Sequence, residues 1–261
     1  MVVPKSYIEL AGRLADTSAK IIEHYFRSLA DIDEKSDETP ITLADRESEV
    51  AMRELIHSQF PDHGIIGEEG KAVFENAEFV WVLDPIDGTK NYACGSYNFG
   101  TLISLIHNRQ FLLGIINQPI LRERWLGIRG EPTLFNGRLA QTRKCSTLGD
   151  AWMFATSPSM FQRGDEARFE ELANCVKHSL FGTDCIGYAL LASGFTDIVC
   201  EATLHPWDYA ALIPVIEGAG GVITDWSGQP LNMDSDGKVL ACGDKNLHAA
   251  ALNKLQKIII E

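Results

Sequence analysis

The sequence lacks the cysteine patterns typical of zinc or redox motifs. Its six cysteines stand apart, with no C-x-x-C pair and no Cys/His cluster at zinc-finger spacing. No run of about 18 apolar residues occurs, and residues 1–14 show no basic region followed by an apolar stretch. These absences predict a cytoplasmic protein with reduced cysteines, no membrane span and no structural zinc.

Positive charge is also scarce. The 261 residues include 36 Asp and Glu against 23 Lys and Arg, which gives a formal net charge of −13. A field of that sign repels nucleic acids and anionic membranes and attracts cations. Hydrophobic residues make up 45% of the chain, an ordinary globular share that excludes wholesale disorder. We therefore predict a globular protein whose partners are small molecules and cations, not nucleic acid or membrane.

The first part of the chain combines helical periodicity with short apolar runs. Apolar spacing predicts a helix over 5–28 and a second from an N-cap at Thr42 to Gln59, burying Val50 and Ile56. The polar stretch 31–40 between them is expected to be an exposed, mobile loop. Apolar runs predict strands over 64–67, 79–83, 100–106, 112–117 and 124–128, with a hairpin tip at 108–109.

From about residue 145 the pattern alternates between helix and strand. It predicts helices over 169–177, 186–193 and 209–218, and strands over 197–201 and 222–224. The change near 138–150 divides the chain into 1–144, an N-terminal α+β half, and 145–261, a C-terminal α/β half. We expect the halves to form one compact unit of mixed α and β layers.

The segment WVLDPIDGTK places Asp84 and Asp87 around a proline. A strand is expected to end at Asp84, and the turn that follows would point both carboxylates into one pocket. Unpaired, they would repel and raise each other's pKa, whereas Mg²⁺ accepts such oxygen ligands and leaves room for a phosphate. The amides of Gly88 and Thr89 would meet phosphate oxygens at a helix start. The alternative is an ordinary Asp-Pro turn in which Asp87 caps a helix.

Three further acids stand at the ends of predicted elements. Glu68 follows a short strand, Asp208 precedes an apolar helix, and Asp45 lies in the first turn of a helix. Each has a simple alternative, as a solvated turn acid, a helix N-cap or an acid favoured by the helix dipole. Together they stand at strand ends and helix starts, where clefts form in α/β proteins.

These motifs, in this order, resemble the inositol monophosphatase superfamily over nearly the whole chain. They are Gly67-Glu68-Glu69, Asp84–Thr89, Trp207-Asp208 and Glu217–Gly221. The resemblance implies fold class α+β, a layered αβαβα sandwich of the inositol-monophosphatase/fructose-bisphosphatase type. It also implies a Mg²⁺-dependent, lithium-sensitive phosphomonoesterase that forms a homodimer.

The resemblance further implies roles for individual residues, carried over by motif. Glu68, Asp84 and the carbonyl of Ile86 would hold a first metal, Asp84, Asp87 and Asp208 a second, and Glu68 a third through water, giving two or three Mg²⁺ per site. Asp45 would pair with Thr89, and together with Glu68 this pair would orient and deprotonate the attacking water. Asp87, Gly88, Thr89 and Asp208 would also contact the substrate.

The second half bears on the substrate. Stretches 99–125 and 183–199 resemble the histidinol-phosphatase branch, although Ile186 and Asn91 depart from it. Asp184 stands where typical inositol phosphatases have a small residue, and an acid there suits a cationic amine or imidazolium. The alternative for Asp184 is a helix N-cap. Glu201 matches the family's substrate-contacting acid.

We therefore predict hydrolysis of histidinol phosphate to histidinol and phosphate, within histidine biosynthesis, by metal-activated water. The alternative substrate is inositol 1-phosphate or another polyol or sugar phosphate. A non-catalytic partner in RNA processing or transcription is disfavoured by the net charge of −13.

Overall fold

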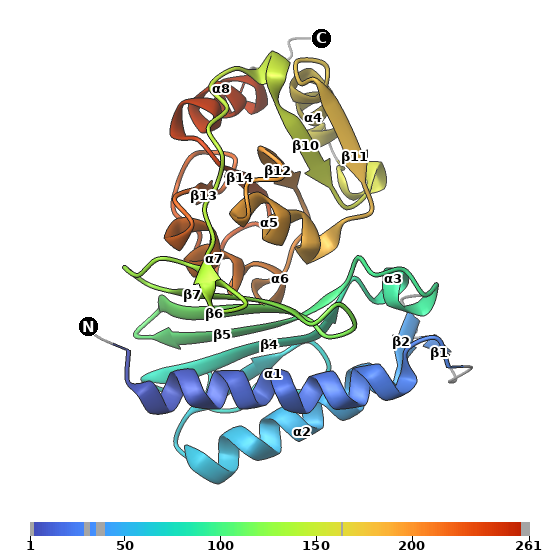
Figure 1. Ribbon diagram of the computed structural model, residues 1–261, viewed down its shortest axis with the longest axis vertical. Coiled ribbons are helices and arrows are strands. Elements are labelled where there is room, and N and C mark those ends of the chain that lie inside the picture. The colour runs from blue at the N-terminus through green and yellow to red at the C-terminus, as the bar shows by residue number, and fades with distance from the viewer. Residues whose placement is uncertain (1–2, 29–31, 35–39, 163, 257–261) are drawn as a thin grey trace.

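Figure 1 shows the computed structural model of the chain, which is built in layers. Two helices cover one face of a seven-stranded sheet, further helices separate this sheet from a five-stranded sheet, and two last helices cover the outer face. The structure describes residues 3–28, 32–34, 40–162 and 164–256. The arrangement is the αβαβα sandwich that the resemblance implies.

The first layer consists of α1 (Lys5–Tyr25) and α2 (Leu43–Gln59), which pack against each other and against the larger sheet. Both predicted helices are confirmed, although α1 ends before the expected residue 28. Ile56 is fully buried, as predicted. The prediction that Val50 is buried is wrong, because α2 turns the face with Met52 inward and leaves 55% of Val50 exposed.

The larger sheet holds its seven strands in chain order. They are β3 (Gly64–Gly67), β4 (Phe79–Asp87), β5 (Gly100–His107), β6 (Gln110–Gln118), β7 (Glu123–Ile128), β8 (Leu134–Phe135) and β9 (Arg138–Leu139). β3 runs parallel to β4, and the other neighbours are antiparallel. All five strands predicted here are confirmed. So is the hairpin tip, where Asn108 and Arg109 have φ angles of 46° and 64°.

The smaller sheet has the order β11-β10-β12-β14-β13. After the short helix α3 (Thr89–Ala93), the remaining elements are η1 (Leu148–Asp150), β10 (Trp152–Ala155), η2 (Pro158–Met160), α4 (Asp165–Ala173), β11 (His178–Phe181), α5 (Asp184–Ala192), β12 (Ile198–Glu201), α6 (Pro206–Tyr209), α7 (Leu212–Gly218), β13 (Val222–Thr224), β14 (Val239–Cys242) and α8 (Lys245–Leu255). The predictions for α5, β12 and β13 are confirmed, and α4 lies four residues before the expected 169–177. The expected helix over 209–218 is divided into α6 and α7 by a turn at 210–211. The sequence analysis did not predict β10, β11, β14 or α8.

The stretch 31–40, expected to be a loop, includes parts of two short strands. β1 (Ile32–Glu34) pairs antiparallel with β2 (Pro40–Thr42). Residues 31 and 35–39 and the side chain of Thr42, the predicted N-cap, lie outside what the structure describes. β9 ends before residue 140 and β10 begins after residue 150, and the division into halves 1–144 and 145–261 stays a prediction. Within the described ranges, no helix combines the length and the apolar character needed to cross a bilayer.

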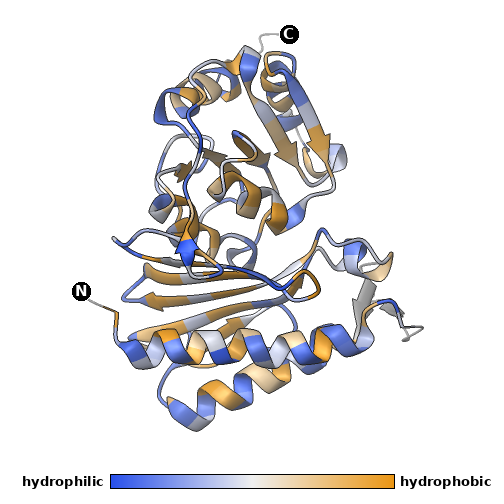
Figure 2. Cartoon of the chain, viewed as in Figure 1, coloured by the Kyte–Doolittle hydropathy of each residue, from blue (hydrophilic) through white to orange (hydrophobic). Residues whose placement is uncertain are grey.

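Both faces of β4 are buried, and each belongs to a different core. Trp81 and Leu83 pack with α1 and α2, whereas Val80 and Val82 pack with α5 and α7. This alternation follows from the two-residue period of a strand. Figure 2 shows apolar residues concentrated in the strands of both sheets, while α1 and α2 mix apolar and polar positions. A central strand covered on both faces is held rigidly, and it is this strand that carries Asp84 and Asp87.

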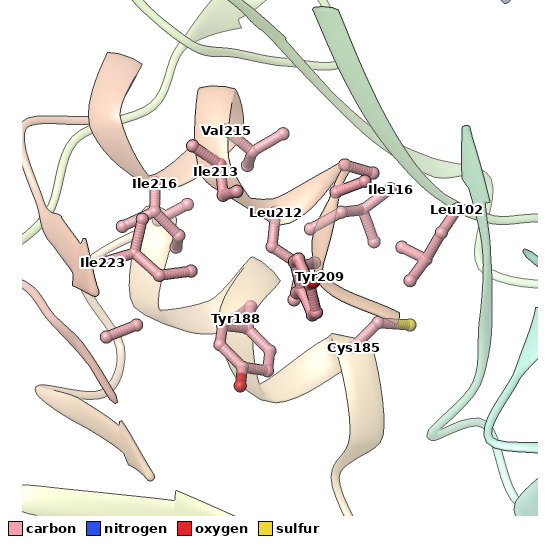
Figure 3. Packing of buried hydrophobic residues seen from close by; sticks show 14 of the residues in the cluster. Leu102, Ile116, Cys185, Tyr188, Tyr209, Leu212, Ile213, Val215, Ile216 and Ile223 are labelled. Atoms are coloured by element: carbon pink, nitrogen blue, oxygen red, sulfur yellow. The ribbon is translucent and has the colours of Figure 1, made fainter. Parts of the chain in front are cut away.

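The middle layer packs tightly between the two sheets. Figure 3 shows Ile213 and Ile216 of α7 in the same apolar cluster as Tyr188 of α5 and Leu102 and Ile116 of the larger sheet. Leu102, Ile116 and Ile216 have no exposed surface. The α6–α7 segment is therefore anchored to β5 and β6.

Glycines in the larger sheet let α7 approach it closely. A Cβ on Gly114 of β6 would overlap the backbone carbonyl of Ala211, and a Cβ on Gly127 of β7 would overlap that of Pro214. The neighbouring atoms are backbone, so they cannot move aside as a flexible side chain would. The position of α6, and with it Asp208, depends on this contact.

We predict that Gly114→Ala lowers the free energy of unfolding by about 1–3 kcal/mol, since the added methyl must displace the backbone at Ala211. Urea denaturation followed by circular dichroism measures this. Gly12→Ala in α1 is the matched control, because nothing lies within 4 Å of a Cβ there. It should raise stability by up to about 1 kcal/mol, as expected for a glycine inside a helix. Equal effects of the two substitutions would contradict the close approach.

Candidate active site

The fold brings five acidic side chains from four separate elements together. One carboxylate oxygen from each of Asp45, Glu68 and Asp84 lies within 4.8 Å of the others, and the same holds for Asp84, Asp87 and Asp208. Asp84 belongs to both clusters. The five acids stand in α2, in the turn after β3, on β4 and in α6, so the elements that the sequence analysis singled out do converge.

An irregularity in β4 sets the directions of Asp84 and Asp87. The strand continues to Asp87 through Pro85, so the prediction that it ends in a turn at Asp84 is wrong. In a regular strand, residues three apart point to opposite faces. The pairing of β4 with β5 shifts register between Asp84 and Asp87, which allows both carboxylates to reach the same cluster. Thr101 of β5 donates a hydrogen bond to the carbonyl of Pro85 at 2.8 Å and holds the irregular segment in place.

Asp84 is the most crowded of these acids. It is 1% exposed, and burial together with Glu68, Asp87 and Asp208 raises its pKa well above the ordinary value. Its Oδ1 is buried and accepts no hydrogen bond from the part of the chain that the structure describes. A buried carboxylate oxygen without a donor among other carboxylates fits a divalent cation as its partner.

Asp208 and Asp87 are held by backbone donors. The N–H of His205 donates to Asp208 at 2.7 Å within a capping box in which His205 is the N-cap of α6 and Asp208 is the third helical residue, so the interpretation of Asp208 as the N-cap is wrong. Burial still raises the pKa of Asp208 to about 8. The N–H of Cys185 donates to Asp87 at 2.6 Å, while Gly88 is the N-cap of α3. The alternative in which Asp87 caps that helix is therefore wrong.

Thr89 lies beside the first cluster. Its hydroxyl lies 3.0 Å from the carbonyl oxygen of Ile86 and 3.4 Å from Oδ2 of Asp45. The pairing of Asp45 with Thr89 is thus present as a contact, and the Ile86 carbonyl shares the same hydroxyl. Gly88 before it has a φ of 86°, a conformation that favours glycine.

Glu49 supports the acidic turn after β3 and was missed by the sequence analysis. It is 1% exposed, and its carboxylate accepts the backbone N–H groups of Glu69 and Gly70, both at 2.8 Å. The guanidinium of Arg53 donates to it at 2.7 Å. These contacts fix the turn that carries Glu68.

A pocket of about 160 Å³ opens beside the acidic clusters. The described residues that line it are Asp87, Thr156, Met160, Asp184, Cys185, Tyr188, Glu201, Leu204, Asp208 and Leu212. Four of these ten carry carboxylates, and no Lys, Arg or His is among them. The pocket is therefore suited to metal cations on one side and to a positively charged organic group on the other.

Asp184 and Glu201 line this pocket as well, although neither is a member of the two clusters. Asp184 accepts a hydrogen bond from Asn91 Nδ2 at 2.5 Å, and the N-cap of α5 is Thr183, so the interpretation of Asp184 as a helix cap is wrong. Burial raises the pKa of Asp184. Glu201 is 2% exposed, and burial raises its pKa to about 7.

Glu201 is saturated with donors from the protein. Its Oε1 accepts from the backbone N–H and the hydroxyl of Thr156 at 2.8 and 2.6 Å, and its Oε2 accepts from the hydroxyl of Tyr188 at 2.9 Å. Little acceptor capacity is left for a substrate, so Glu201 contributes mainly charge. Asp184 is the acid of this pair with more freedom to meet a ligand.

The sequence analysis had given no role in the site to four side chains that shape it, which are Glu49, Asn91, Thr156 and Tyr188. Two of them carried a local signal, since Glu49 lies one helical turn after Asp45 and Asn91 directly follows the D-G-T-K motif. Thr156 and Tyr188 carried none, because only the pairing of β10 with β12 brings Thr156 opposite Glu201.

Comparison with known proteins identifies the family. The family model of the inositol monophosphatase family matches residues 4–260. The bifunctional phosphatase IMPL2, chloroplastic, of Arabidopsis thaliana is 44% identical over 96% of this chain and 75% of its own length. A histidinol-phosphatase of Chlorobaculum parvum is 33% identical over 94% of this chain and 96% of its own.

Other relatives carry different names. An inositol-1-monophosphatase of Bacillus subtilis is 29% identical over 94% of this chain and 92% of its own, and a Nus factor SuhB of Pasteurella multocida is 27% identical over 95% of both.

The same fold occurs in solved structures. That of an inositol monophosphatase from Zymomonas mobilis superimposes with a TM-score of 0.91, at 43% identity, covering 98% of this chain and all of the other. The family match along nearly the whole chain, the identity to these relatives and the two acidic clusters all indicate the same family. The chain belongs to the inositol monophosphatase family of metal-dependent phosphomonoesterases.

Proposed function

We propose that this phosphatase hydrolyses histidinol phosphate to histidinol and phosphate with the help of Mg²⁺. The observation that carries the proposal is the pocket with four carboxylates and no basic side chain among its described lining residues. Metal ions would neutralise Asp87 and Asp208, whereas Asp184 and Glu201 lie beyond the clusters and would still face the substrate with negative charge. An amine or imidazolium would both donate hydrogen bonds to such a pair and compensate its charge, whereas a neutral polyol would only donate hydrogen bonds.

Two or three Mg²⁺ would occupy the acidic clusters. Glu68, Asp84 and the carbonyl of Ile86 would hold the first ion, Asp84, Asp87 and Asp208 the second, and Glu68 a weaker third through water. Oxygen ligands in a rigid buried setting, including the donor-free Oδ1 of Asp84, fit this ion. Bound Mg²⁺ supplies Lewis-acid stabilisation of negative charge on the phosphoryl and leaving-group oxygens.

The side chains beside the metals would manage the attacking water. With the Ile86 carbonyl holding a cation, the Thr89 hydroxyl would donate to Asp45, which lies 3.4 Å away. The Thr89 oxygen then keeps a lone pair for a proton of the water, and Glu68 orients that water from the other side. The backbone around Gly88 and Thr89, next to Asp87, would receive the phosphate.

Inositol 1-phosphate is the second candidate substrate. The relative named an inositol-1-monophosphatase favours it. A homodimer, a cytoplasmic location and the absence of a nucleic-acid partner stay predictions. The net charge of −13 supports the last of these.

We predict that the protein with Mg²⁺ releases phosphate from histidinol phosphate with a kcat/KM about a hundredfold above that for inositol 1-phosphate. This ratio corresponds to about 2.7 kcal/mol of transition-state discrimination. Asp184→Asn should lower kcat/KM for histidinol phosphate about tenfold to a hundredfold, since a hydrogen bond to a charged group contributes about 1.5–3 kcal/mol. The rate with inositol 1-phosphate should change little.

The two substrates act as controls for each other. Equal losses on both would contradict a role for Asp184 in recognising a cation, and a preference for inositol 1-phosphate in the unaltered protein would favour the second candidate. Phosphate release that survives thorough treatment with EDTA would contradict the metal-dependent mechanism as a whole.

The raised carboxylate pKa values predict how metal and pH act together on stability. Folding raises the pKa of Asp208 from 3.8 to about 8, so between these values the folded protein holds a proton that the unfolded chain has lost. Without metal, stability should therefore fall as pH rises from about 4 to about 8. Mg²⁺ requires ionised carboxylates, so its stabilising effect should grow over the same range.

Thermal unfolding at pH 6 and pH 9, with EDTA or with Mg²⁺, measures this coupling. The difference in Tm between the Mg²⁺ and EDTA samples should be larger at pH 9. Asp208→Asn should reduce the dependence on pH. A Tm difference that is the same at both pH values would contradict the prediction.

A further inference from the structure

Two asparagines, Asn91 of α3 and Asn98 of the segment before β5, clamp the turn that leads into α5. Asn91 Nδ2 donates to the Asp184 carboxylate at 2.5 Å and lies 3.2 Å from the carbonyl oxygen of Gly182. Asn98 Nδ2 donates to the same carbonyl at 2.8 Å. Asn91 therefore differs from Asn98 in one respect, which is that it also holds the carboxylate.

The turn needs such support because its backbone is strained. Asp184 has a φ of 44°, in the left-handed region that a residue with a side chain rarely adopts. That conformation costs about 1–3 kcal/mol and persists only where the surroundings enforce it. On the other side of the turn, the N–H of Gly182 donates to the carbonyl of Thr156 at 2.9 Å. The strained conformation is thus fixed from both halves of the site.

Asp184 also rests directly on the segment that carries the metal cluster. A Cβ added to Gly88 would lie 3.2 Å from both Cβ and Cγ of Asp184. Asp184 contributes negative charge to the surroundings of Asp87, and both line the same pocket. The hydrogen bond from Asn91, which stands two residues beyond Thr89, restrains the Asp184 carboxylate in this position, and Thr156 supplies a second side-chain hydrogen bond to it.

We propose that Asn91 is a positioning residue that holds the Asp184 carboxylate in the pocket and thereby sets the preference for a substrate with a cationic leaving group. This inference rests on the proposed function, because it assumes that Asp184 meets a cation. It makes α3 a second element of substrate selection, next to α5. Asn91, which directly follows the D-G-T-K motif, would then influence which organic group the pocket accepts by holding Asp184, without itself touching the substrate.

The test compares kcat/KM for histidinol phosphate and inositol 1-phosphate in the full-length protein with Mg²⁺. Asn91→Ala should lower the ratio of the two values about tenfold, mainly through a higher KM for histidinol phosphate, with hydrolysis of inositol 1-phosphate retained. Asn98→Ala is the matched control. It removes a donor to Gly182 but none to Asp184, so the ratio should stay within about twofold of that of the unaltered protein.

A double-mutant cycle separates positioning from a general structural role. In an Asp184→Asn background, Asn91→Ala should change the ratio by less than about twofold, because the group on which it acts is altered. If the ratio in the double variant falls by the product of the factors seen in the two single variants, the two residues act independently and the inference is overturned. If Asn91→Ala loses activity on both substrates, Asn91→Leu repeats the test with a side chain of nearly equal size. An unchanged ratio in Asn91→Leu would likewise overturn the inference.

Failure of the inference and failure of the proposed function give different results. If the unaltered protein shows no preference for histidinol phosphate, both are overturned. If the unaltered protein has the preference and Asn91→Ala keeps it, only the role of Asn91 is overturned, and the proposed function stands.

Discussion

Repulsion among the carboxylates around Asp84 is the constraint on which the rest of the site depends. Asp84 is almost fully buried and has Glu68, Asp87 and Asp208 as neighbours, so its pKa is raised well above the ordinary value. Such a group of acids is unfavourable in isolation and becomes favourable only when protons or cations are present. The same property that weakens the protein without metal makes the site a strong ligand for divalent cations.

The fold holds these acids in place with elements that have little freedom to move. β4 is packed on both faces, α6 is tied to the larger sheet through the close contact of α7 with Gly114 and Gly127, and the turn carrying Glu68 is fixed by Glu49. Rigid support matters because repelling groups would otherwise separate. A metal site whose ligands are already in position gains affinity, since little ordering remains to be done on binding.

The pocket divides its negative charge into two parts with different partners. The clusters around Asp84 suit hard cations, whereas Asp184 and Glu201 lie beyond them and are shaped by hydrogen bonds from Asn91, Thr156 and Tyr188. Three donors occupy most of the acceptor capacity of Glu201, which leaves Asp184 with more capacity to accept a hydrogen bond from a ligand. The first part fits the metal-dependent phosphatase chemistry of the family, and the second part is the one on which the proposed substrate preference rests.

The sequence by itself determined the helices α1 and α2, the five long strands of the larger sheet and the acids of the metal clusters. Apolar periodicity is a local property, and the acids stand in short motifs around Glu68, Asp84 and Asp208. Only the tertiary structure decided the register shift in β4, the burial of Val82 on one face and Trp81 on the other, and the partners of Asp184. Those features depend on which distant elements meet, and no local pattern in the sequence records that meeting.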